Sequence, residues 1–173
     1  MKIKKGIPLI DQHDESGFWD GKFGGSYIPE TLKKPVEDLT NLFEKLRKDK
    51  KFIQERDYYY TNWVHKGPTP FIKLENLTNY LGGAQVWAKV VSEARGGAHK
   101  IYGAITAAML CKAMGKKFLV TDTGAGYNGK MFSIAGKHFG LKVKVFMGIK
   151  DILRQKPNCD AMRANGAEIV PVY

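Results

Sequence analysis

Apolar positions recur at spacings of three and four along residues 35–48. They are Val36, Leu39, Leu42, Phe43 and Leu46. Because an α-helix turns every 3.6 residues, this spacing places them on one helix face, with charged side chains on the other. The pattern predicts a helix from Pro35 to about Lys48 with one buried apolar stripe. A second, short helix is predicted over residues 51–63.

The pattern changes after "KGPTPF" at residues 66–71, where two prolines interrupt the helical periodicity. Short apolar runs then alternate with helical segments. Strands are predicted over residues 84–90, 116–122, 141–148 and 168–173, and helices over 98–115, 129–140 and 158–166. Strands joined by helical crossovers predict an α/β fold, a parallel sheet with flanking helices. The expected organisation is an irregular and helical N-terminal segment, 1–66, followed by an α/β domain, 67–173.

Composition argues for a folded protein without a membrane segment. Hydrophobic residues make up 43% of the chain, and no apolar run reaches the length that spans a bilayer. The start, "MKIKKGIPLIDQHDESG", lacks the apolar stretch of a signal peptide. We therefore expect a cytoplasmic protein.

The net charge of +11 is carried mainly by residues 101–173. The lysines there are spread over helix ends and strand faces, and no aromatic RNA-binding motif accompanies them, so a solvated surface is predicted rather than a nucleic-acid site. The histidines are scattered, and Cys111 and Cys159 have no metal-binding spacing. We expect no metal site, and reduced cysteines that pack in the interior.

The stretch "TDTGAGYNGK", residues 121–130, contains a G-x-G-x-x-G pattern between a predicted strand and a predicted helix. A dinucleotide site also needs an acidic residue at the end of the following strand, but that strand ends in Phe146-Met147-Gly148. The loop can still direct backbone N–H groups toward an anion at a helix N-terminus. A phosphate or a carboxylate would suit it, and a tight turn without a ligand is the alternative.

The stretch "RGGAHKIYG", residues 95–103, places His99 and Lys100 at the start of a predicted helix. Lysine is unusual there, because its charge meets the positive end of the helix dipole. That environment suits a lysine that forms a Schiff base with an aldehyde cofactor. A solvated lysine without a chemical role is the alternative.

Together these stretches resemble the β chain of tryptophan synthase, a family of fold-type II pyridoxal phosphate enzymes. The resemblance runs through "FGGSYIPETL", "GPTPF", "GGAHKI", "MGKK", "TGAGYNG" and "GAEIVPV" in the same order. It covers essentially the whole chain but only the N-terminal part of the family, whose C-terminal half is absent. It implies that 67–173 binds the cofactor, pyridoxal 5'-phosphate, and the substrate.

The resemblance also implies roles for individual residues. Lys100 would hold the cofactor as a Schiff base and move the α-proton, and His99 would help to bind its phosphate. Asp122 would act as the acid–base group, where the family carries a glutamate that is one methylene longer. The substrate carboxylate would lie on the loop formed by Thr123, Gly124, Ala125, Gly126, Tyr127 and Asn128. Tyr127 and Asn128 stand where the family has glutamine and histidine.

The implied reaction is a lyase-type β-replacement of L-serine with indole that yields L-tryptophan. The implied macromolecular partners are an α-type subunit, a second copy of the chain, or a complementary half-chain. An alternative function is a noncatalytic homologue that acts as an interaction protein with an α-type subunit or a half-chain. A basic nucleic-acid binder is a third, weaker interpretation.

Overall fold

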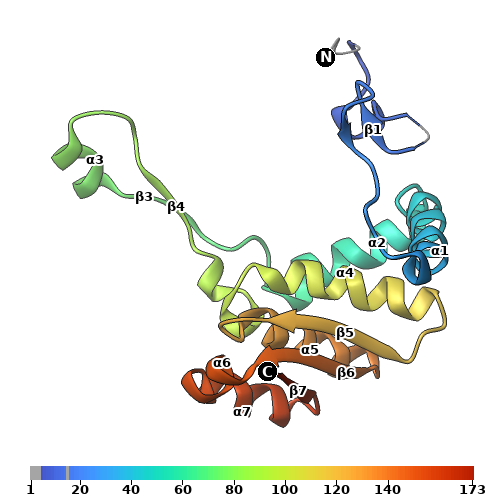
Figure 1. Ribbon diagram of the computed structural model, residues 1–173. Helices are drawn as coiled ribbons and strands as arrows, with labels where there is room; N and C mark the ends of the chain where they lie inside the picture. Colours follow the sequence, from blue (N-terminus) through green and yellow to red (C-terminus); the bar gives the residue numbers. More distant parts are fainter. Residues whose placement is uncertain (1–4, 15) are drawn as a thin grey trace. The chain divides into compact units, whose positions relative to one another are not determined.

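The computed structural model describes residues 5–14 and 16–173 (Figure 1). The chain divides into two compact units, one up to Thr40 and one from Asn41 to Tyr173. Each unit is described by itself. The expected division into segments 1–66 and 67–173 stays a prediction.

The first unit contains little regular structure. A 3₁₀ turn, η1 (Leu9–Asp11), precedes an antiparallel ribbon of β1 (Phe18–Trp19) and β2 (Phe23–Gly24). The Trp19 indole nitrogen donates a hydrogen bond to the Leu9 carbonyl at 2.7 Å. None of the described residues in this unit is buried. Local hydrogen bonds rather than an apolar core therefore order it.

Helix α1 (Glu30–Leu46) continues from the first unit into the second. It begins before the predicted start and contains Pro35 within it. Ion pairs between Lys33 and Glu30 and between Lys34 and Asp38 join successive turns of this part of the helix. The predicted buried stripe is wrong, since the stripe residues Val36 and Leu39 are each 38% exposed. Periodicity identifies residues that share a helix face, but it does not establish that another element covers that face.

Helix α2 (Lys50–Tyr58) begins where the side chain of Asp49 accepts a hydrogen bond from the backbone N–H of Phe52 at 2.9 Å. It continues into a π-helical turn, η2 (Tyr59–Trp63), which ends with a bond from the N–H of Val64 to the carbonyl of Tyr59 at 2.9 Å. The predicted helix over 51–63 is confirmed.

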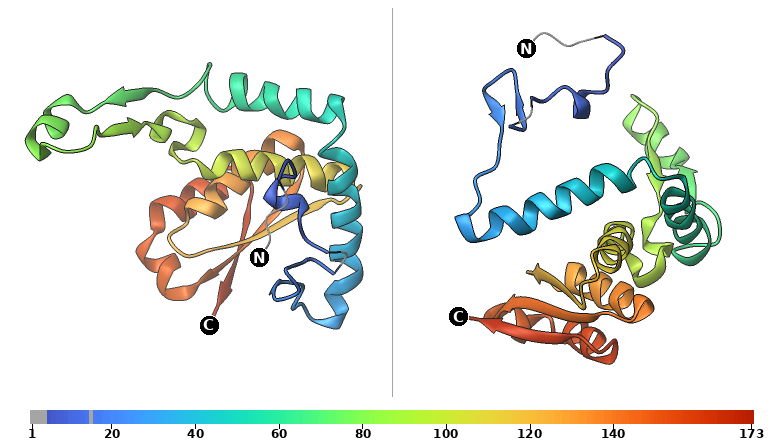
Figure 2. Two further views of the ribbon diagram at one scale, coloured as in Figure 1. Left: turned by 90° about the horizontal axis from the view of Figure 1, so that it is seen from above. Right: turned by 90° about the vertical axis from the view of Figure 1, so that its right-hand side faces the viewer.

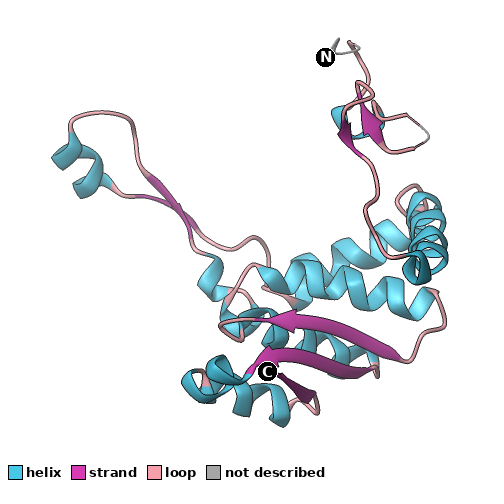
Figure 3. Cartoon of the chain, in the orientation of Figure 1, coloured by secondary structure: helices cyan, strands magenta, loops and turns pink. Residues whose placement is uncertain are grey.

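A β-hairpin with a helix at its tip follows (Figure 3). Strand β3 (Phe71–Lys73) pairs antiparallel with β4 (Trp87–Lys89), and α3 (Glu75–Leu81) lies between them. The rings of Phe71 and Trp87 stack at 5.1 Å. The strand predicted over 84–90 therefore exists but does not begin the parallel sheet. Residues nearby in sequence supply its partner strand, which the sequence analysis did not predict.

The rest of the second unit follows the predicted alternation of strands and helices. Two 3₁₀ turns, η3 (Val91–Glu93) and η4 (Arg95–Gly97), lead into it. The helices are α4 (Lys100–Ala113), α5 (Tyr127–Phe139), α6 (Ile149–Arg154) and α7 (Lys156–Ala164). The strands are β5 (Phe118–Thr123), β6 (Lys142–Gly148) and β7 (Glu168–Val172), which form a parallel sheet in the order β5-β6-β7. The α/β fold with a parallel sheet is confirmed. The 3₁₀ turns η3 and η4 and the short helix α6 were not predicted.

The core lies between this sheet and the helices on one of its faces (Figures 1 and 2). Alternate β6 residues Val143, Val145 and Met147 are buried, and they belong to the same core cluster as residues of α4, α5 and α7. Because successive side chains of a strand point to opposite sides, the residues between these buried ones lie on the second face of the sheet. There Phe118, Val120 and Phe146 are each at least 40% exposed.

Two glycines set how closely α5 approaches the sheet. A Cβ at Gly129 would lie 2.5 Å from Sδ of Met162 and 2.6 Å from Cγ1 of Val145, and one at Gly136 would collide with the Val143 side chain. Both glycines are buried in α5. The absence of a Cβ at these positions therefore allows the helix to pack directly on β6.

We predict that Gly129→Ala lowers the free energy of unfolding by about 1–3 kcal/mol, because the added methyl group forces apart a packed interior. The matched control is Gly103→Ala in α4, where an added Cβ meets nothing within 4 Å. That variant gains up to about 1 kcal/mol from helix propensity. Urea unfolding followed by circular dichroism measures both. Equal effects of the two substitutions would contradict the packing argument.

Candidate active site

Lys100 is the first residue of α4, and His99 occupies the N-cap position before it. Both side chains are exposed. The preceding turn is fixed against α5, because a Cβ at Gly96 would lie 2.5 Å from Cε of Met131. The start of α4 and the C-terminal end of β5 lie at the same end of the sheet (Figure 1). The fold thus brings the two predicted stretches, 95–103 and 121–130, to one edge.

The loop of residues 124–126 connects β5 to α5 and is held from within. The hydroxyl of buried Thr123 accepts a hydrogen bond from the N–H of Gly126 at 3.1 Å. Gly126 has φ +90°, in the left-handed region that favours glycine. A Cβ there would also lie 2.6 Å from Cβ of Asn158. The hydrogen bond between the Gly126 N–H and the Thr123 hydroxyl therefore holds the turn in shape.

Asn158 is a site residue that the sequence analysis missed. It lies in α7, and its side-chain amide donates to the carbonyl of Ala125 at 2.8 Å. An asparagine near a predicted helix start is an ordinary capping residue. No local signal connected it with a loop 33 residues earlier in the chain. This hydrogen bond ties the loop to α7.

Asn128 links the start of α5 to the end of β5. Its amide nitrogen donates to the hydroxyl of Thr121 at 2.7 Å and to the carbonyl of Asp122 at 3.0 Å. Asp122 itself is exposed, and Tyr127 is 47% exposed with the Lys130 ammonium 5.7 Å from its ring centre. Gly124 has open space where a Cβ would stand. The carboxylate and the loop are therefore accessible to a small molecule.

These residues suit a pyridoxal phosphate site by the chemistry of their groups. Lys100 supplies an exposed primary amine, which an aldehyde requires. The turn before α5 supplies a helix N-terminus, where a negatively charged group is favoured. Asp122 supplies a carboxylate at the adjoining strand end. Their individual roles stay predictions.

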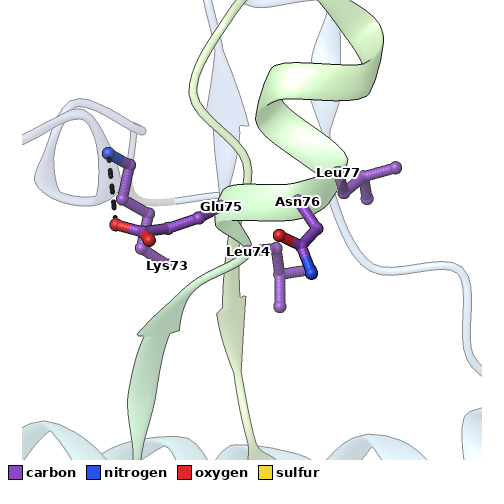
Figure 4. Close-up of a pocket in the computed structure, with 5 residues that line it drawn as sticks. All are labelled: Lys73, Leu74, Glu75, Asn76 and Leu77. Carbon is purple, nitrogen blue, oxygen red and sulfur yellow. Dashed lines mark ion pairs between the residues drawn. The ribbon is translucent and has the colours of Figure 1, made fainter.

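Two cavities lie away from the predicted site residues. One of about 530 Å³ is lined by Lys73, Leu74, Glu75, Asn76 and Leu77 at the junction of β3 and α3 (Figure 4). Lys73 and Glu75 form an ion pair of 4.0 Å there. Another of about 430 Å³ lies beside Gly148 and Tyr173. Neither is lined by a predicted site residue.

Residues 63–173 match the family model described as pyridoxal-phosphate dependent enzyme. The chain belongs to this family. The match begins in η2 and includes Lys100, Asp122 and the whole 124–126 loop. The enzymes of this family depend on pyridoxal phosphate, the cofactor that the sequence analysis expected.

Within the pyridoxal-phosphate-dependent family, the chain is similar to tryptophan synthase β chains. It is 41% identical to that of Leptospira biflexa over 88% of its own length, and 42% identical to that of Pseudomonas syringae over 92%. In both cases the chain spans 38% of the length of the relative. The predicted resemblance to part of this enzyme is confirmed.

Solved structures support the fold. The chain matches diaminopropionate ammonia lyase of Escherichia coli with a TM-score of 0.52 at 22% identity, over 61% of this chain and 33% of the other. It matches a pyridoxal 5'-phosphate-dependent aspartate racemase with a TM-score of 0.52 at 24% identity, over 60% and 32%. The fold-type II assignment is confirmed. In the described part of the chain, no helix has the length and apolar character to cross a membrane.

We predict that Thr123→Val speeds hydrogen exchange at the Gly126 amide, because valine keeps the shape of threonine but removes the acceptor of that N–H. Thr123→Ser is the matched control, since it keeps the hydroxyl. Loss of one such hydrogen bond costs about 1 kcal/mol, which corresponds to roughly fivefold faster exchange if the amide exchanges by opening of this turn. Exchange that is unchanged in Thr123→Val would show that the threonine does not hold the loop.

Proposed function

We propose that this chain carries the cofactor lysine and the substrate loop of an enzyme that replaces the hydroxyl of L-serine with indole to form L-tryptophan. The observation that carries the proposal is its identity of 41–42% with tryptophan synthase β chains over about nine tenths of its length. The relatives' substrates, L-serine and indole, and an α-type subunit as partner, belong to the same proposal.

The proposed roles are those that the family resemblance implies for two residues at the start of α4. Pyridoxal phosphate, when bound, draws electrons away from the α-carbon of an amino acid. Lys100 would bind the aldehyde through its amine and hold the α-proton at the same nitrogen. His99, at the N-cap of α4, would contact the cofactor phosphate. These two residues adjoin each other at one helix start.

The proposed loop function depends on its rigidity. Thr123 and Asn158 fix the backbone of residues 124–126 through hydrogen bonds of 3.1 and 2.8 Å. A turn that is already ordered loses little entropy when it binds a carboxylate. Asp122, directly before it, would move the proton that accompanies loss of the serine hydroxyl. Because its side chain is short, its reach to that oxygen depends on the position of the strand end.

We predict that pyridoxal phosphate gives a saturable visible absorption band with the wild-type chain and that Lys100→Ala removes it. Lys117→Ala, which alters an exposed lysine at the other end of the sheet, should leave the band unchanged. Addition of L-serine should shift the band, and D-serine should shift it less. A band of equal strength in folded Lys100→Ala, checked by circular dichroism, would contradict the role of Lys100.

A further inference from the structure

A cavity of about 440 Å³ lies in the second unit, between α2 with its π-helical turn and the helices α4 and α5. Its volume is in the range of small-molecule sites. It is lined by residues from four elements, α2, η2, α4 and α5, and neither Lys100 nor the 124–126 loop is among them. It is therefore distinct from the candidate active site.

One wall of this cavity is aromatic. Tyr59 contacts His138 and Phe139 edge to face, with ring centres 5.3 and 5.0 Å apart, and His138 and Phe139 contact each other at 5.0 Å. Trp63 supports His138 from outside at 4.5 Å. Phe52 adds a half-buried ring to the lining. Mutual ring contacts of this kind hold the wall in place before any ligand arrives.

The cavity also carries one carboxylate and one ammonium group. Glu55 lies one helical turn before Tyr59, and Lys112 lies one turn after Met109, so both face the cavity with those neighbours. Among residues 5–14 and 16–173, neither has an ion-pair partner within 4.0 Å. The Lys112 ammonium lies 5.8 Å from the ring centre of Phe139. Both charges are available to a ligand.

The other titratable side chains of the lining add no charge at neutral pH. Burial, with smaller contributions from Arg95 and Lys112, lowers the pKa of His138, so its imidazole is neutral there. Burial and the nearby Glu55 raise the pKa of Tyr59, which keeps its phenol protonated. The lining thus presents one negative charge, one positive charge and several rings.

These features select one chemical class. A simple anion would meet Glu55, and a simple cation would meet Lys112, so each would be repelled by one wall. A neutral hydrocarbon would leave both charges unused. We propose that this cavity binds an aromatic α-amino acid, with its carboxylate on Lys112, its ammonium group on Glu55 and its ring against Tyr59 and Phe139.

The first test is calorimetric titration of the wild-type chain with L-phenylalanine. Two probes each lack one charge, 3-phenylpropionate without the ammonium group and phenethylamine without the carboxylate. We expect L-phenylalanine to bind saturably, and each probe to bind about tenfold more weakly, as loss of one charged hydrogen bond predicts. The absence of saturable heat with L-phenylalanine in the millimolar range, or equal binding of all three, would overturn the proposal.

Variants locate the site. Lys112→Met and Glu55→Gln should each weaken L-phenylalanine binding about tenfold. Lys117→Met, which removes an exposed lysine outside the cavity, should not. The methyl signal of Met109, assigned through Met109→Leu, should shift on titration because that residue lines the cavity. A Met109 signal that does not move during saturation would overturn the proposed location.

Lys100→Ala separates this site from the proposed catalytic one. L-phenylalanine should bind this variant with unchanged affinity, whether or not pyridoxal phosphate binds the wild type. If Lys100→Ala abolishes binding while Lys112→Met does not, the amino acid occupies the candidate active site, and the proposal for the cavity is wrong.

Discussion

The contact between α5 and the parallel sheet is the constraint on which the candidate site depends. Gly129 lies where any Cβ would strike Val145 of β6 and Met162 of α7. Because this helix is pressed against the sheet in its first turn, its N-terminus is fixed immediately after β5. The 124–126 loop joins the end of β5 to the start of α5, and because both are fixed, the loop has little conformational freedom. The packing of the core therefore sets the position of the turn for which anion binding is proposed.

The same packing joins residues that are distant in sequence. Met131 of α5 fills the space beside Gly96, in the turn before Lys100, while Asn158 of α7 bonds to the loop itself. The turn before Lys100 packs against α5, and the 124–126 loop leads directly into that helix. This arrangement accounts for how Lys100 and the proposed substrate loop come to the same end of the sheet, although α4 and β5 separate them in the sequence.

The parallel sheet and its flanking helices could be predicted from the sequence, because both follow from local periodicity. The loop and Lys100 were singled out because glycines and a lysine at helix starts are locally unusual, and their proposed roles came from the family resemblance. Other features depend on contacts that no local pattern reports. Asn158 contacts the loop only because the chain folds α7 against it. Strand β4 pairs with β3 in a hairpin, and the apolar stripe of α1 is not buried. Periodicity predicts faces, but it does not predict what those faces meet.

We propose that Lys100, among many exposed lysines, is the amine that takes the cofactor. Chemical trapping tests this most directly. The chain is treated with less than one equivalent of pyridoxal phosphate, reduced with borohydride, digested and mapped by mass spectrometry. The account predicts that the label is concentrated on Lys100. A label spread over surface lysines such as Lys116 and Lys117, with no enrichment at Lys100, would contradict it.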